Sequence, residues 1–179
     1  MLVVNGMSYS SRSSSFSNSA IVVTCNTDDY GSADPLAGIE FQKAIERKAF
    51  KAAGAGWQAP AQNLMDFLAG RVSKSLNKNS FAMGLSSVDM TEVFPAFVNT
   101  ALMSAFKSWK EAYPLFVSHH AILLGPETRT SAPVRLKRTE RYESVNVKNL
   151  FPIGEGSGYT GGITSSAADA IKAVESRMG

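Results

Sequence analysis

The most informative stretch of the sequence is Phe151-Pro152-Ile153-Gly154-Glu155-Gly156-Ser157-Gly158-Tyr159-Thr160-Gly161-Gly162-Ile163. It predicts a short apolar strand, a glycine-rich turn with one carboxylate and, from about Gly162, a helix rich in small residues. This order places backbone N–H groups and a helix N-terminus against whatever occupies the turn, which is how proteins hold phosphates and electron-rich rings. The alternative that remains open is a purely structural glycine loop.

The turn matches neither of the two common nucleotide motifs. It has no Gly-Lys-Ser/Thr of a Walker loop, and it is not a G-x-G-x-x-G opening with an acid on a second strand. Glu155 does not attract phosphate, but it would accept hydrogen bonds from hydroxyls such as those of a ribityl or ribose chain. The positive end of the helix that starts near Gly162 would stabilise a phosphate or the N1/C2=O edge of a reduced flavin. The turn therefore favours a nucleotide or flavin contact.

Size and composition limit the classes of protein to which the chain can belong. The chain has 179 residues, 44% of them hydrophobic, which suits one domain or a small domain plus part of another. The net charge of +3 permits anionic ligands without indicating nucleic acid. The single cysteine, Cys25, excludes an intrachain disulfide and suits a reducing compartment. No apolar run approaches the roughly 20 residues of a membrane helix, and Asn5-Gly6 interrupts the apolar start before a secretory signal could form. We expect a cytoplasmic protein that binds neither membranes nor nucleic acid.

Hydrophobic periodicity predicts an α+β chain. Helices are expected over Leu36–Ala53, Gln62–Leu68 and Phe94–Ala112, and strands over Leu2–Val4, Ala20–Cys25 and His119–Leu124. Trp57–Pro60 is expected to be a turn and residues 70–88 a loop. Adjacent histidines on a strand point to opposite faces, so His119 and His120 do not predict a metal site.

Two polar segments allow two interpretations each. Tyr9–Ser19 is dominated by serine and is either a flexible loop or a loop whose Arg12 and hydroxyls face an anion. Glu127–Arg141 is strand-like and basic, and is either an anion-contacting ladder or an edge strand protected by charge.

Several separated motifs resemble the uncharacterised FAD-dependent dehydrogenases, which are glutathione-reductase-like flavoproteins also described as NAD(FAD)-utilising dehydrogenases. The matching segments, in the family's order, are Val4–Ser8 with Arg12, Asn18–Ala20, Ala59–Gln62, Asp66–Phe67, Glu127–Arg135 and Leu150–Ile163. In that family a second domain is inserted into a Rossmann-like FAD domain. The resemblance implies an inserted, substrate-side domain of mixed strands and helices over residues 1–125. It also implies a C-terminal strand-turn-helix piece of the FAD domain over residues 126–179.

The family's FAD-pyrophosphate motif lies in an N-terminal FAD-binding portion that is not in this sequence. The resemblance thus implies a piece of a longer oxidoreductase, which uses FAD and a small-molecule substrate and leaves NAD(P) open as a further coenzyme. Alone, the piece would be inactive. No catalytic acid, base or nucleophile stands out, which fits chemistry carried by the cofactor. The alternative, from another class, is a stand-alone module that binds a phosphorylated small molecule.

The resemblance also assigns site residues. The cofactor-binding set is Arg129, Thr130, Ser131, Gly154, Glu155, Gly156, Gly158, Gly161, Gly162 and Ile163. Within it, Glu155 would bond the ribityl or pyrophosphate region, and Gly161, Gly162 and Ile163 would bring the helix N-terminus to the flavin ring. The substrate-side set is Asn5, Ser8, Arg12 and Arg135.

Overall fold

The computed structural model describes residues 1–178, and over this range the fold is α+β. Four α-helices are present: α1 (Ala37–Ala52), α2 (Leu64–Leu68), α3 (Ala96–Ala112) and α4 (Ile163–Met178). Three strands form one mixed sheet: β1 (Ala59–Asn63), β2 (Leu85–Ser87) and β3 (Ile122–Leu124). Two 3₁₀ turns, η1 (Thr27–Tyr30) and η2 (Met90–Glu92), precede α1 and α3. The α+β prediction is confirmed.

The chain divides into two compact units. Unit 1 contains Met1–Asn26 and Lys43–Glu127, and unit 2 contains Thr27–Gln42 together with the chain from Thr128 onward. The division falls inside α1, whose first residues pack with unit 2 and whose later residues pack with unit 1. Each unit is described by itself.

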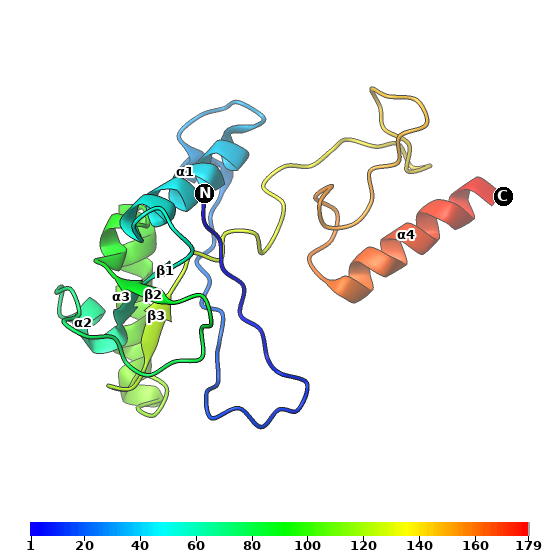
Figure 1. The fold of residues 1–179 in the computed structure, drawn as a ribbon. Helices are drawn as coiled ribbons and strands as arrows, with labels where there is room; N and C mark the ends of the chain where they lie inside the picture. Colours follow the sequence, from blue (N-terminus) through cyan, green and yellow to red (C-terminus); the bar gives the residue numbers. More distant parts are fainter. Residues whose placement is uncertain (179) are drawn as a thin grey trace. The chain divides into compact units, whose positions relative to one another are not determined.

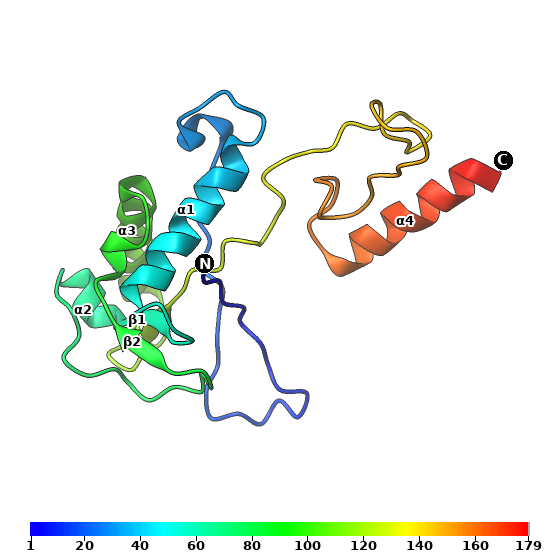
Figure 2. The same ribbon diagram turned by 45° about the horizontal axis from the view of Figure 1, so that its top comes forward.

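Unit 1 is organised by the sheet, whose strand order is β2-β1-β3 (Figures 1 and 2). Strand β1 pairs in parallel with β2, Ala59 opposite Leu85, and antiparallel with β3, Ala61 opposite Leu124. The first four residues of β1 are buried because it is the central strand. The turn predicted over Trp57–Pro60 is therefore wrong at its end, since Ala59 and Pro60 belong to β1.

Aromatic side chains fill the space between α2 and α3. Phe67 of α2 and Phe106 of α3 are both fully buried, and their rings meet edge to face with centroids 6.4 Å apart. Trp109 continues the cluster with a centroid 5.8 Å from that of Phe106. Asp89 caps the short turn η2 that precedes α3, since its carboxylate accepts a hydrogen bond from the Thr91 amide at 2.9 Å, and α3 itself starts after Pro95. The predicted α3 and its apolar face are confirmed.

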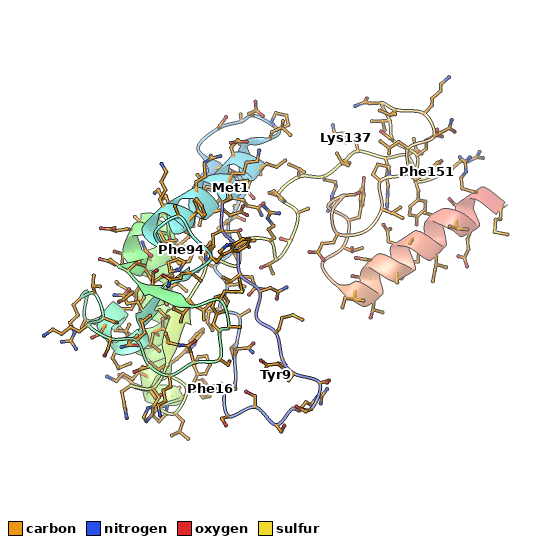
Figure 3. All side chains as sticks on the ribbon, in the orientation of Figure 1. Met1, Tyr9, Phe16, Phe94, Lys137 and Phe151 are labelled. Carbon is orange, nitrogen blue, oxygen red and sulfur yellow. The ribbon has the colours of Figure 1, made fainter. Side chains whose placement is uncertain are left out.

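The first 26 residues are extended but form no strand, so the strands predicted over Leu2–Val4 and Ala20–Cys25 are wrong. Leu2 donates its amide to the carbonyl of Glu46, and Val4 donates to that of Pro126. The alternating exposure expected of a strand is present, but no neighbouring strand supplies a ladder of hydrogen bonds. Between the two segments lies an exposed loop that carries Tyr9 and Phe16 (Figure 3).

In unit 2 the glycine-rich turn leads into α4, which begins at Ile163, where the sequence predicts it. The apolar strand expected before the turn and the basic strand expected over Glu127–Arg141 are both absent from the described residues. An isolated bridge between Arg138 and Ser144 is the strand-like pairing found there. Phe151 lies against the C-terminal half of α4, where the Arg177 guanidinium stacks on its ring at 4.6 Å (Figure 3).

Candidate functional site

The glycine-rich turn is built around an ion pair between Arg138 and Asp169. Arg138 Nη1 donates to Asp169 Oδ2 at 2.8 Å, and Nη2 donates to Oδ1 at 2.7 Å. Nη1 also donates to the Pro152 carbonyl at 2.8 Å, and the Gly154 amide donates to Asp169 Oδ2 at 2.9 Å. Each charged side chain is only 11% exposed. One pair therefore joins the basic segment, the entry to the turn and α4.

The pair keeps both charges in place. Hydrogen bonds from Arg138, which outweigh the opposing effect of burial, and from the Gly154 amide lower the pKa of Asp169 to about 2. The Asp169 carboxylate in turn raises the pKa of Arg138. Neither group changes its protonation near neutral pH, so the pair positions the turn and does not transfer protons.

Tyr159 closes the turn over this pair. The Arg138 guanidinium carbon lies 3.6 Å from the centroid of the Tyr159 ring, a cation–π contact. The Tyr159 hydroxyl donates to the Leu136 carbonyl at 2.9 Å, and Arg135 Nε donates to the Gly158 carbonyl at 2.9 Å. Arg135 and Arg138 thus hold the turn itself. The basic segment therefore supports the turn through these two arginines. From the sequence alone, either an anion-contacting ladder or an edge strand protected by charge was open for this segment.

The glycines of the turn fall into two groups. Gly154 and Gly158 have positive φ values of 71° and 80°, which side chains rarely adopt. A Cβ on Gly158 would also collide with the Val134 carbonyl oxygen, because the two backbones pass in direct contact. These two glycines are required by the chain's own backbone.

Gly156 and Gly161 have no such requirement. Neither has a positive φ, and no heavy atom lies within 4 Å of the position that a Cβ would take. At Gly162 the nearest atom is the Ser165 hydroxyl oxygen, at an ordinary 3.7 Å. The missing side chains at Gly156 and Gly161 therefore leave backbone open to a group from outside the chain.

Three predicted residues meet at the start of α4. The Gly162 carbonyl accepts from the Ser166 amide at 2.9 Å, which starts the helix, and Ile163 is 93% exposed. Gly161 is exposed beside them. Glu155 is half-buried, and its carbonyl accepts from the Gly158 amide at 2.8 Å, which closes the turn. The structure thus brings together Gly161, Gly162 and Ile163 on the helix end and leaves that end accessible.

The other predicted residues lie elsewhere. Arg129, Thr130 and Ser131 are exposed in unit 2, on a segment tied to α1 because Gln42 Nε2 donates to the Thr128 carbonyl at 2.8 Å. Asn5, Ser8 and Arg12 are exposed in unit 1, on the N-terminal loop. Arg12 has a φ of 51°, and its amide donates to the Tyr9 carbonyl. The two sets lie in different units, and the cofactor-binding role of the first and the substrate-side role of the second stay predictions.

Sequence reasoning missed Asp169 and Tyr159 altogether and placed Arg138 only within a basic run. A carboxylate on the second turn of a helix that follows a glycine turn is the one signal that could have suggested Asp169. Its partner lies 31 residues away in the sequence, and no local pattern joins the two.

Residues 1–178 contain neither a membrane-spanning helix nor a cluster of metal-ligating side chains. No helix there has the length and apolar character needed to cross a membrane. No three side chains of His, Cys, Asp or Glu type come together there as a metal-binding group.

The chain is similar to known proteins over most of its length. The model of a family described as "FAD-dependent protein, C-terminal domain-like" matches residues 1–130. An uncharacterized protein of Clostridium beijerinckii is 43% identical over 176 residues, which are 97% of this chain and 33% of the relative. The chain thus spans about a third of that relative's length. The match covers most of the chain and confirms the resemblance drawn from the motifs, so the chain belongs to the family of FAD-dependent proteins, whose C-terminal domain it contains.

Proposed function

We propose that this chain is the C-terminal portion of an FAD-dependent oxidoreductase of the dehydrogenase type, to which it contributes a substrate-side domain and a flavin-facing glycine-rich turn. Membership of an FAD-dependent family supports the cofactor. The observation that carries the residue assignment is the pair of open glycines, Gly156 and Gly161, for which neither packing nor backbone conformation accounts.

These residues fit a flavin. Bound FAD would supply hydride or electron transfer, and the chain would supply contact and electrostatics. The amides at Gly161, Gly162 and Ile163 lie at the positive end of α4, which stabilises an electron-rich ring edge or a phosphate. Glu155 would accept hydrogen bonds from ribityl hydroxyls. Gly154 and Gly158 would act indirectly, by shaping the turn.

The division into roles follows the proposed boundary near residue 125. Residues 1–125 would form the substrate-side domain, and residues 126–179 would return to the FAD-binding portion. Asn5, Ser8 and Arg12 would contact substrate, and Arg129, Thr130 and Ser131 would contact the flavin or substrate, whereas Arg135 would act through the turn that it holds. The family match ends at residue 130, so the turn assignment rests on its own geometry.

A stand-alone module for a phosphorylated small molecule has less support. It needs free cations beside the turn, but Arg138 is committed to Asp169, and Arg135 donates its Nε to the Gly158 carbonyl. A thermal shift of the isolated chain with mononucleotides, without a shift for FAD, would favour the module over the flavoprotein.

The decisive experiment uses a chimera in which this chain replaces the matching third of the Clostridium beijerinckii relative. Purified chimera is expected to retain FAD, and Gly161→Val is expected to weaken FAD binding about tenfold or more, because the added methyl groups would occupy the approach to the helix end. Gly56→Val is the matched control, since Gly56 lies in unit 1 and is equally open. Equal FAD affinity in the Gly161→Val and Gly56→Val chimeras would refute the assignment.

A further inference from the structure

Helix α4 has one face that unit 2 already uses. Ser166, Asp169, Ala173 and Ser176 recur every three to four residues and therefore lie on one side of the helix. Ser166 contacts Thr160 through their hydroxyls at 2.7 Å, Asp169 holds Arg138, and Ala173 is buried. This inward face is small and largely polar.

A second face of α4 is apolar and exposed. It consists of Ile163, Ala167, Ile171, Val174 and Met178, which we call the outer stripe. At 3.6 residues per turn these five positions fall within roughly 80° of arc, well away from the inward face. Ile163, Ile171, Val174 and Met178 are 93%, 59%, 60% and 84% exposed. An apolar stripe of this width along one side of a helix is the pattern of a helix face that packs against another apolar surface.

Unit 2 has little else in its interior. Its buried hydrophobic residues are Ala37 and Ala173, whereas unit 1 buries large side chains such as Phe67 and Phe106. Burial of a valine, isoleucine or methionine side chain is the main source of packing free energy in a domain. Unit 2 therefore carries the outer stripe without the apolar surface that would cover it.

We infer that the outer stripe packs against the part of the longer protein that lies outside these 179 residues, and that this part presents an apolar face to α4. The inference rests on the proposed function in taking the chain as one portion of a longer protein. The relative is about three times as long as its match to this chain, so a partner segment of ample size exists there. The family match ends at residue 130, so α4 lies beyond the C-terminal domain that it describes.

A second copy of the chain is a weaker candidate. The stripe offers five side chains from each copy, far fewer than the roughly 20–30 residues that each partner contributes to a stable interface. A covering segment of the same protein needs less area, because covalent connection raises its effective concentration.

The test uses the chimera in which this chain replaces the matching third of the Clostridium beijerinckii relative, and it follows hydrogen exchange of the α4 amides by mass spectrometry. Exchange is expected to be at least about tenfold slower in the chimera than in the isolated chain, because the outer stripe is covered there. Ile171→Glu is expected to remove that protection, because a carboxylate would be buried without a partner. Ala168→Glu, which adds the same side chain at an exposed position of α4 outside the stripe, is expected to change the exchange less than about twofold. Circular dichroism checks that both variants keep α4.

Three results would overturn the inference. One is equal exchange of α4 in the Ile171→Glu and Ala168→Glu chimeras. Another is equal exchange of α4 in the chimera and in the isolated chain. The third is a dimer of the isolated chain that Ile171→Glu dissociates, which would make the stripe a self-association surface. Flavin absorbance of the chimera is read separately. A colourless chimera in which Ile171→Glu exposes α4 would keep this inference and contradict the proposed function.

Discussion

Arg138 and Asp169 face each other across two parallel hydrogen bonds of 2.8 and 2.7 Å, although 31 residues separate them in the sequence. Each holds a further backbone group, the Pro152 carbonyl for Arg138 and the Gly154 amide for Asp169. The glycine-rich turn is therefore shaped by an ion pair behind it, which keeps the helix end in position without occupying it.

Removal of one partner should loosen the turn and spare unit 1. Arg138→Met would leave the Asp169 carboxylate buried without its cation, which costs about 3 kcal/mol. The Gly154 amide donates its hydrogen bond to Asp169, and its hydrogen exchange with solvent should then accelerate about 100-fold. Both tryptophans, Trp57 and Trp109, lie in unit 1, so their fluorescence transition in urea should stay unchanged.

The matched control for that variant is Arg71→Met. Arg71 pairs with Asp66 at 2.6 Å, but its side chain is 71% exposed, so its loss should not measurably change stability. Slow Gly154 exchange in Arg138→Met, or equal effects of the two variants, would contradict the role given to the buried pair.

Acid should weaken the same contact. The Arg138 guanidinium and the Gly154 amide lower the pKa of Asp169 from its ordinary 3.8 to about 2 in the folded chain, so the unfolded chain binds the proton more readily. The stabilisation, about 2 kcal/mol, is complete above pH of about 4 and is lost as the pH falls through about 2. The chemical shift of the Gly154 amide should titrate with a midpoint near 2. A midpoint near 4, or an unchanged titration in Asp169→Asn, would show that the pair does not form in solution.

The two groups of glycines predict opposite outcomes for alanine. Gly158→Ala combines a φ of 80° with a collision against the Val134 carbonyl, and should destabilise the turn by at least about 2 kcal/mol. Gly156→Ala meets open space at an ordinary φ and should leave stability unchanged. Amide exchange of the turn distinguishes them. If Gly156→Ala proves as damaging as Gly158→Ala, the open character of Gly156 is wrong.

In unit 1, the buried amide of Gln62 should contribute measurably to stability. Gln62 is fully buried. Its Oε1 accepts from the Met90 amide at 2.9 Å, and its Nε2 donates to the Arg71 carbonyl at 2.8 Å. Gln62→Leu leaves both backbone groups without that partner and should cost about 2 kcal/mol in urea unfolding followed by tryptophan fluorescence. Wild-type stability in this variant would mean that water replaces both bonds.

The sequence was sufficient for elements whose signal is local. The starts of α3 and α4 were predicted close to where they occur, at Phe94 against Ala96 for α3 and at Gly162 against Ile163 for α4. Strand β1 was missed because Pro60 has no amide to donate and is unusual in a central strand. Leu2–Val4 is apolar and mostly β-branched, as a strand often is, but pairing depends on a partner strand that local sequence does not reveal.

For the site, sequence reasoning located the turn but could not sort its glycines. Nothing in the sequence distinguishes Gly154, Gly156, Gly158 and Gly161. Only the backbone conformation and the neighbouring atoms separate the glycines that the turn requires from those that face open space. Arg138 was read as one cation in a basic segment because its partner on α4 is remote in sequence. Long-range pairing of this kind decides which charges remain available to a ligand.

The most direct test of the central claim is a titration of FAD, followed by flavin fluorescence, into the isolated 179-residue chain and into the chimera with the relative. The account predicts that the chimera binds about one FAD per chain tightly and that the isolated chain binds it weakly or not at all, because the turn is one part of a site. Tight, stoichiometric FAD on the isolated chain, or a folded chimera that takes up none, would contradict it.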